Sequence, residues 1–303
     1  MGSFASALEN SRRFSAVVEK MEDALRNDPN NLKLRLGLGS AKRRAIESQK
    51  VFEEYAAKNH VDLIRYRIEN AAESYAVKAV ADSISHFQGS FTGIVDFLEA
   101  GPKERATYSN KMVDQTKLEL AYTFPGSLGV VLSVQNDRDL ISGRFDKAVD
   151  VLSEFLRIND TNSALDASRH LGLGLVSQLC AWVDANSSWD NNVDYVWKRS
   201  DGIARGEFVS QDKFHEISDI FKNAEEEEIN PIEVRGILIG LDLDASFHFV
   251  VPNGKDYRGK LSDQFVKVPT TVGKEYVAKI AEKSVRKVAT GKTVTTYQLL
   301  NLN

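Results

Sequence analysis

The chain has 303 residues, of which 42% are hydrophobic and 27% are charged. This composition is typical of a globular protein and excludes an intrinsically disordered, collagen-like or membrane-spanning chain. At roughly 100–200 residues per domain, the length indicates two or three domains, each able to bury a core of its own.

The formal net charge of −4 is unevenly distributed along the chain. Residues 1–60 carry a net charge of +3, residues 61–228 carry −11 and residues 229–303 carry +4. The whole chain therefore lacks the charge expected of a nucleic-acid-binding protein. Either basic end could still attract a polyanion or the acidic middle of another copy.

Cysteine usage and the N-terminus indicate where the protein works. The single cysteine, Cys180, excludes an internal disulfide, and the five histidines are too scattered for a structural zinc site. The N-terminus lacks the apolar stretch of a secretory signal, and nowhere do 18 apolar residues run together. We therefore expect a cytoplasmic protein with no membrane partner, and we expect Cys180 to be a buried thiol.

The first 60 residues are predicted to form a helical hairpin. Apolar residues recur at helical spacing up to Leu25, and residues 27–30 provide a stop and a turn. Residues 31–39 are ambiguous, because their leucines alternate as in a strand. A longer pattern favours a second helix. It comprises Leu34, Leu38, Ala41, Ala45, Ser48, Phe52 and Tyr55.

The middle of the chain is predicted to combine a small antiparallel sheet with several helices. The expected strands are 61–68, a hairpin over 118–134 with its turn at 124–127, and a second hairpin of 193–199 with 204–209. The first expected helix starts at Val77 and ends at Gly101. Three further helices are expected at 145–158, 163–185 and 211–223.

The helix that starts at Val77 has the clearest heptad pattern in the chain. Its seam consists of Val77, Val80, Ile84, Phe87, Phe91, Ile94 and Leu98. Such a stripe packs either on the core of its own domain or on another subunit. The sequence leaves both alternatives open, so these residues are also a candidate oligomer interface.

The C-terminal part has the period of two that is typical of strands. The acidic run Glu225–Glu228 and the nearby Pro231 mark a composition break and a candidate domain boundary. Strands are then expected at 232–241, 245–251, 256–261, 274–286 and 292–300. They predict a small closed or half-closed β-barrel. The predicted fold is therefore α+β, with domains at 1–60, 61–224 and 229–303.

Two segments carry a resemblance to other proteins. Leu118–Val134 and Val234–Leu302, the latter with GILIGLD, FHF, YRGKL and a closing YQLLNL, resemble a group of bacterial proteins of about this length without an assigned activity. The likeness spans most of the chain and includes no catalytic motif. The last 75 residues are also similar in outline to SH3-like and OB-type small barrels. Neither resemblance implies a function.

The familiar catalytic motifs are missing from the sequence. The glycines at Gly37 and Gly39, and those at Gly172 and Gly174, lack the third glycine of a dinucleotide loop and the spacing of a P-loop. No acidic residue is followed two positions later by lysine, as in nucleases of the restriction type. The sequence therefore identifies no catalytic residue and no cofactor, and whether the protein is an enzyme stays open, with a non-catalytic role favoured.

One acidic strand is a candidate metal site. Strand alternation over residues 242–249 would put Asp242, Asp244 and His248 on one face, where they could hold a divalent ion or exchange a proton. These residues would then serve a metal-assisted hydrolase. A solvated strand face, or a turn at Asp242 and Asp244, would give the same pattern.

The last predicted hairpin is a candidate nucleic-acid interface, since basic and aromatic residues on a barrel ribbon can bind phosphates and bases. Its residues are Lys274, Tyr276, Lys279, Lys283, Arg286, Lys287, Lys292 and Tyr297. Lysines that protect an exposed edge strand would give the same pattern. Lys33, Arg35, Lys42, Arg43, Arg44 and Lys50 could extend this surface or form a solvated helix face.

The leading hypothesis is a non-catalytic binding or assembly protein that self-associates and uses its barrel as a recognition module. Its expected partners are a second copy or another protein. Nucleic-acid binding through the basic hairpin is the alternative. A role in bacterial defence is a further hypothesis that no residue carries, and the metal-assisted hydrolase is the third reading.

Overall fold

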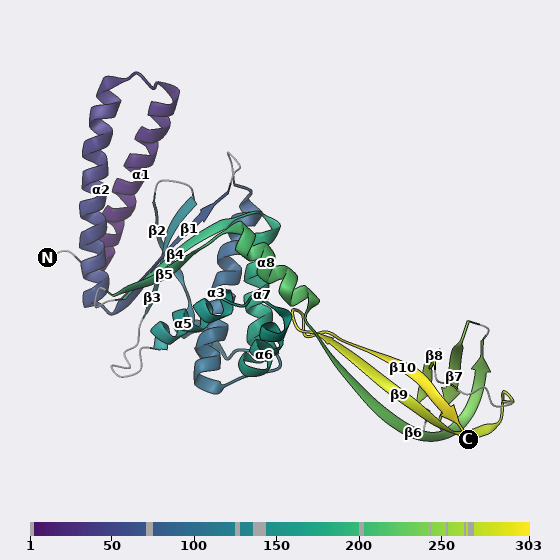
Figure 1. Ribbon diagram of the computed structural model, residues 1–303. Helices are drawn as coiled ribbons and strands as arrows, with labels where there is room; N and C mark the ends of the chain where they lie inside the picture. The colour runs from purple at the N-terminus through teal and green to yellow at the C-terminus, as the bar shows by residue number, and fades with distance from the viewer. Residues whose placement is uncertain are drawn as a thin grey trace. The chain divides into compact units, whose positions relative to one another are not determined.

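The computed structural model describes residues 3–70, 75–124, 128–135, 144–199, 203–242, 244–252, 254–263, 265 and 270–303. Within these residues the chain forms eight helices and ten strands, which confirms the predicted α+β class (Figure 1). The chain divides into two compact units, Met1–Phe221 and Lys222–Asn303, which are described separately. The division into three domains stays a prediction.

The first unit begins with the predicted helical hairpin. Helix α1 spans Phe4–Asn27 and helix α2 spans Leu32–Lys58, so the helical interpretation of residues 31–39 is confirmed. Each helix has a polar N-cap, Ser3 and Asn31, whose side-chain oxygen accepts a hydrogen bond from a backbone N–H of the first turn. The core of the hairpin is thin. Its buried residues are Ala7, Ser11, Ser15, Val18, Ala45, Phe52 and Ala56.

A five-stranded antiparallel sheet forms the centre of the first unit. Its strands are β1 (Val61–Glu69), β2 (Glu119–Phe124), β3 (Leu128–Gln135), β4 (Asn192–Lys198) and β5 (Ala204–Val209). The spatial order is β2-β3-β1-β4-β5, so β2 and β5 are the edges. Both predicted β-hairpins are present, and residues 125–127 of the predicted turn lie outside the described residues.

Helices cover one face of this sheet, and the helical hairpin covers part of the other. Aromatic rings from β1 and β4 pack with Phe87 and Trp182 on the first face. On the opposite face, Phe52 of α2 packs against Leu63 and Tyr122. The helices of the first face, seen together in Figure 1, include α3 (Val77–Ala100), α5 (Arg144–Leu156), α7 (Leu173–Ser188) and α8 (Gln211–Asn223).

One predicted helix is two helices in the structure. The pattern over 163–185 predicts a continuous helix, but α6 (Thr161–Leu171) ends at Gly172 and α7 starts anew. Gly172 has φ +79°, and a Cβ there would lie 2.5 Å from the backbone nitrogen of Lys103. Leucine spacing alone continues across this break, which is why the periodicity concealed it. A short helix, α4 (Asn110–Thr116), was not predicted.

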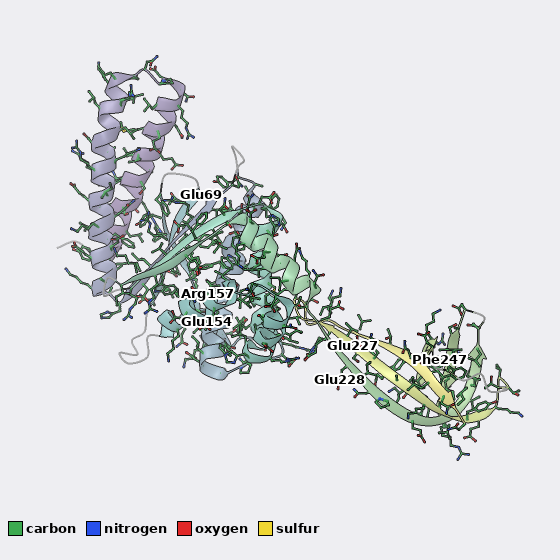
Figure 2. All side chains as sticks on the ribbon, viewed as in Figure 1. Glu69, Glu154, Arg157, Glu227, Glu228 and Phe247 are labelled. Carbon is green, nitrogen blue, oxygen red and sulfur yellow. The ribbon has the colours of Figure 1, made fainter. Side chains whose placement is uncertain are left out.

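The second unit contains the predicted β-barrel. Its strands are β6 (Glu225–Leu241), β7 (Ser246–Val250), β8 (Asp256–Leu261), β9 (Glu275–Lys287) and β10 (Thr293–Leu302). They close in the order β10-β8-β7-β6-β9, with β10 and β8 parallel and the other pairs antiparallel. The barrel is filled by buried side chains, among them Phe247, which is labelled in Figure 2.

Two details of this unit differ from the sequence expectations. Glu225–Glu228 belongs to strand β6, where it pairs with β9 over the whole acidic run. Residues 242 and 244–245 form a turn, in which Ala245 has φ +62° and Asp242 N–H donates to Ser246 C=O, so β7 begins only at Ser246. The turn therefore replaces the start of the strand expected at 245, and Leu243 lies outside the described residues.

Candidate functional site

The predicted basic hairpin is largely neutralised by the acidic run opposite it. Lys283 Nζ lies 2.8 Å from Glu227 Oε2, and Arg286 lies 3.0 Å from Glu226. Lys287 reaches Glu225 at 3.9 Å. Figure 2 shows Glu227 on β6 beside β9. A polyanion at these three cations would have to compete with carboxylates already in place.

The aromatic residues of this hairpin do not share a face with the lysines of β9. Side chains alternate between the two faces of β9, so Glu282 extends from the face opposite to that of Lys279, Lys283 and Lys287. Tyr297 of β10 lies directly opposite Glu282 and shares its face. The Tyr297 hydroxyl donates to Glu282 at 3.2 Å. The Tyr276 hydroxyl bonds to the backbone of Thr271, and both rings pack against the barrel core. Lys274, Lys279 and Lys292 are exposed and form no ion pair with described residues.

The residues of the candidate metal site have separate partners. Lys260 Nζ lies 2.9 Å from Asp244 Oδ2, and the hydroxyl of Ser246 lies 2.7 Å from Asp244 Oδ1. These hydrogen bonds, from Lys260 first, lower the pKa of Asp244 to about 2. The same hydroxyl lies 3.0 Å from Asp242 Oδ2. Both aspartates therefore contact the Ser246 hydroxyl, and Asp244 also forms an ion pair with Lys260.

His248 belongs to a different pair. Its Nε2 lies 2.7 Å from Asp256 Oδ1 on β8. Hydrogen bonding to Arg258, more than the nearby imidazole, lowers the pKa of Asp256. Among the described residues, no group of three or more His, Cys, Asp and Glu side chains could hold a metal ion. The hydrolase reading therefore has no geometric support in this part of the chain.

The heptad seam of α3 mostly packs within its own unit. The Phe87 ring lies 4.8 Å from that of Tyr66, and the Phe91 ring lies 5.1 Å from that of Trp197. Ile94 is also buried, whereas Val80, Ile84 and Leu98 are half-buried and Val77 is 85% exposed. In this conformation a second copy could contact only the less buried members of the seam.

Cys180 lies inside α7, in the core of the first unit. Burial raises the pKa of its thiol, and the charge of Asp184 adds to the effect. The thiol is therefore protonated at neutral pH and shielded from solvent. These are the properties of a packing residue rather than a nucleophile.

The helical hairpin exposes more apolar surface than the sequence pattern indicated. Leu32, Leu36 and Ile46 on α2 are 67%, 69% and 64% exposed. Their spacing places them on one side of the helix, opposite the side that packs on α1. The basic residues on this helix are exposed too, and among them Lys42 pairs with Glu22 of α1 at 2.7 Å.

A groove of about 370 Å³ runs between α1 and α2. It is lined by three apolar residues, Ala7, Phe14 and Val51, and by four polar or charged ones, Asn10, Arg44, Glu47 and Ser48. Arg44 and Glu47 form no ion pair with any described residue. In the sequence, Arg44 is recognisable only as a member of a basic patch, because the groove depends on how the two helices meet.

A serine, a histidine and an aspartate meet where α7 ends. Ser187 Oγ lies 2.8 Å from His215 Nδ1, and His215 Nε2 lies 2.8 Å from Asp190 Oδ1. Ser187 is only 7% exposed, and the end of a helix presents carbonyl groups, which cannot stabilise an oxyanion. The arrangement fastens α8 to α7. Ser187 and His215 are 28 positions apart in the sequence, which is too far for a short motif to reveal their contact.

Comparison with known proteins adds no family to this description. No family model and no curated protein matches the chain. A matching solved structure, described as "Crystal structure of Ag(I)CusF", is 15% identical, covers 24% of this chain and 96% of that chain, and has a TM-score of 0.16. At this TM-score the likeness carries no argument.

No helix in the described ranges is long and apolar enough to cross a membrane.

Proposed function

We propose that the protein is a non-catalytic assembly protein that self-associates through its helical hairpin. The observation that carries this proposal is the apolar side of α2, where Leu32, Leu36 and Ile46 are each exposed by more than 60%. Scattered exposed apolar residues are ordinary, but three that share one side of one helix can be covered together by a helix of a partner.

The thin core of the hairpin supports the same proposal. Two antiparallel helices bury only one side of each other, and seven residues of α1 and α2 are buried here. Packing against the hairpin of a second copy would produce a four-helix arrangement with apolar residues inside. The apolar area removed from water would favour the association by about 25 cal/mol per Å² before the costs of binding.

Charge indicates that the occupant is a second copy. Arg44 and Glu47 line the groove beside the apolar Phe14 and Val51, and they have no ion-pair partner among the described residues. In a two-fold symmetric contact, every contact between two different residues of the two subunits occurs twice, once in each direction. Arg44 can then pair with Glu47 of the partner subunit, and the reciprocal pair forms by symmetry.

The barrel serves in this proposal as a recognition module, because it is a separate compact unit with its own filled core. Nucleic-acid binding remains the alternative role for its basic hairpin. It has less support than self-association, since Lys283, Arg286 and Lys287 already pair with the acidic run of β6. A cytoplasmic location stays part of the hypothesis.

The test replaces the exposed apolar residues by charges in the full-length chain. The variant Leu36→Glu with Ile46→Glu should raise the dissociation constant of self-association by roughly tenfold or more, about 1.4 kcal/mol, in sedimentation velocity experiments. The matched control is Val113→Glu on α4, where the replaced side chain is 47% exposed. Equal self-association of all three proteins would contradict the proposal.

A further inference from the structure

Strand β5 is an edge of the central sheet and is open on its outer side. It pairs with β4 in antiparallel register, and none of the other described residues pairs with it. Its residues are exposed apart from Glu207, which is half-buried, and Val209, which is buried. Edge strands with unpaired backbone groups are the places where sheets accept a further strand. By contrast, the Arg12 guanidinium covers the carbonyls of Leu120 and Ala121 on the opposite edge strand, β2.

The register shows which backbone groups of β5 point outward. Arg199 N–H donates to Ile203 C=O at 2.8 Å, which makes this pair a hydrogen-bonded pair of the ladder. Hydrogen-bonded and non-hydrogen-bonded pairs alternate in an antiparallel ladder. Ala204, Gly206 and Phe208 therefore occupy the non-hydrogen-bonded positions against β4, and their N–H and C=O groups face the open side.

These outward groups are arranged so that β5 can pair with a second β5. A two-fold axis through Gly206 would place Ala204 opposite Phe208 of the partner subunit, in hydrogen-bonded pairs formed by outward groups on both strands. The same register places Arg205 opposite Glu207 of the partner subunit, and each subunit contributes one such pair. Opposite charges at directly facing positions favour strand pairing, and like charges disfavour it.

The single chain leaves this charge pair incomplete. Glu207 Oε2 is buried and has no hydrogen-bond partner among the described residues. Arg205 contacts Asp150 of α5 at 3.0 Å, in an exposed ion pair that contributes little. Two apolar side chains at this edge are also exposed, Ile203 by 47% and Phe208 by 57%. A buried carboxylate oxygen without a partner is costly, so a cation from a second strand would stabilise it.

We propose that a second copy of the chain docks on β5, so that two five-stranded sheets join into one continuous sheet. The contact deepens the proposed function, on whose self-association it rests, and it uses a surface separate from the helical hairpin. A subunit with both contacts would have two neighbours, which leads to assemblies larger than a dimer.

The test uses full-length proteins in which the hairpin contact is already weakened by Leu36→Glu with Ile46→Glu. In this background the β5 contact should still give dimers in sedimentation velocity experiments. Adding Arg205→Glu or Glu207→Arg places like charges opposite each other, and each change should raise the dissociation constant by roughly tenfold. The double exchange of both residues restores opposite charges and should restore the dimer.

Mixing the two single-exchange proteins provides the sharpest comparison. The Arg205→Glu protein carries glutamate at both paired positions, and the Glu207→Arg protein carries arginine at both. Each protein alone should therefore dimerise weakly, whereas a mixture of the two should form heterodimers. A monomeric hairpin-weakened protein, or single exchanges that dimerise as well as their parent, would overturn the β5 contact and leave the hairpin proposal standing. A wild-type chain that does not self-associate at all would overturn both.

Discussion

Arg205 and Glu207 lie on either side of Gly206 on β5 and extend from the same face of the strand, the face that also carries Tyr195 and Trp197 of β4. The glycine between them is required by the sheet itself. A Cβ at Gly206 would collide with the carbonyl oxygen of Tyr195 and lie 2.7 Å from the Cα of Val196. Close approach of the two backbones therefore fixes the position of both charged residues.

This close approach predicts the cost of a methyl group at Gly206. Gly206→Ala should lower the free energy of unfolding of the first unit by about 1–3 kcal/mol, because β5 must shift away from β4. Urea denaturation followed by tryptophan fluorescence measures this, since Trp182, Trp189 and Trp197 all lie in the first unit.

Gly39→Ala is the control for that experiment. Nothing lies within 4 Å of a Cβ at Gly39, which is in the exposed part of α2. Alanine has the higher helix propensity, so this change should raise the free energy of unfolding by roughly 1 kcal/mol. A Gly206→Ala protein as stable as the wild type would contradict the described pairing of β4 and β5.

The buried hydroxyl of Tyr66 predicts a second stability effect. It lies 2.7 Å from Ser83 Oγ and accepts a hydrogen bond from Trp182 Nε1 at 2.9 Å. Burial raises the pKa of Tyr66 to about 12, so the group is neutral at ordinary pH. Tyr66→Phe leaves the buried Trp182 Nε1–H without an acceptor and removes one hydrogen bond of Ser83, so it should cost about 1–3 kcal/mol in the free energy of unfolding.

The size of the Tyr66→Phe effect should depend on its partner. Ser83 also donates to Asn186 Oδ1 at 2.7 Å, so the three polar side chains act as one network. The double change Tyr66→Phe with Ser83→Ala should cost less than the sum of the single changes. Strict additivity would show that these hydroxyls do not interact.

Cys180 should be inert in the folded protein. Burial raises the pKa of its thiol, so the reactive thiolate is scarce and the sulfur is shielded. Ellman's reagent should label less than a tenth of the thiol in an hour at pH 8 without denaturant and all of it in urea, by an order-of-magnitude expectation for buried thiols. Rapid labelling in buffer would place Cys180 at the surface instead.

The barrel should show the effect of the Asp244 contacts at low pH. Hydrogen bonds from Lys260 and Ser246 lower the pKa of Asp244 to about 2 from its ordinary value of 3.8. A lowered pKa stabilises the folded state above the ordinary value, and this contribution is lost as the pH falls from about 4 to about 2. Lys260→Met removes the hydrogen bond that contributes most to this lowering of the pKa.

NMR titration of the Asp244 carboxyl carbon measures that prediction directly. In the wild-type protein the midpoint should lie near pH 2, and in the Lys260→Met protein it should move towards 3.8. An unchanged Asp244 midpoint in the variant would rule out the Lys260 contact.

The architecture was predictable from periodicity and turn residues, and the surfaces were not. Alternation identified the strands of both units, and the 3.6-residue period identified α2 in spite of its alternating leucines. The break at Gly172 was missed because the leucine spacing continues across it, and the close approach of the Lys103 backbone, which leaves no room for a side chain there, involves a residue distant in the sequence. Long-range contacts of this kind leave no local signal.

The candidate sites illustrate the same limit. Spacing grouped the lysines of β9 correctly along the strand, but it could not show that the glutamates of β6 pair with them across the ladder. It likewise put Asp242 and His248 on one face, whereas a turn separates them. The open edge of β5 became visible only when the sheet order was known, because an edge is a property of the whole sheet.

The mass of the full-length chain in solution as a function of concentration tests the central claim most directly. Sedimentation equilibrium of the wild-type protein should give a mass that rises with concentration above the 33.8 kDa of one chain, and the Leu36→Glu/Ile46→Glu protein should require a higher concentration for the same rise. A wild-type mass that stays at one chain up to roughly 100 µM, a dissociation constant equivalent to about −5.5 kcal/mol, would contradict self-association.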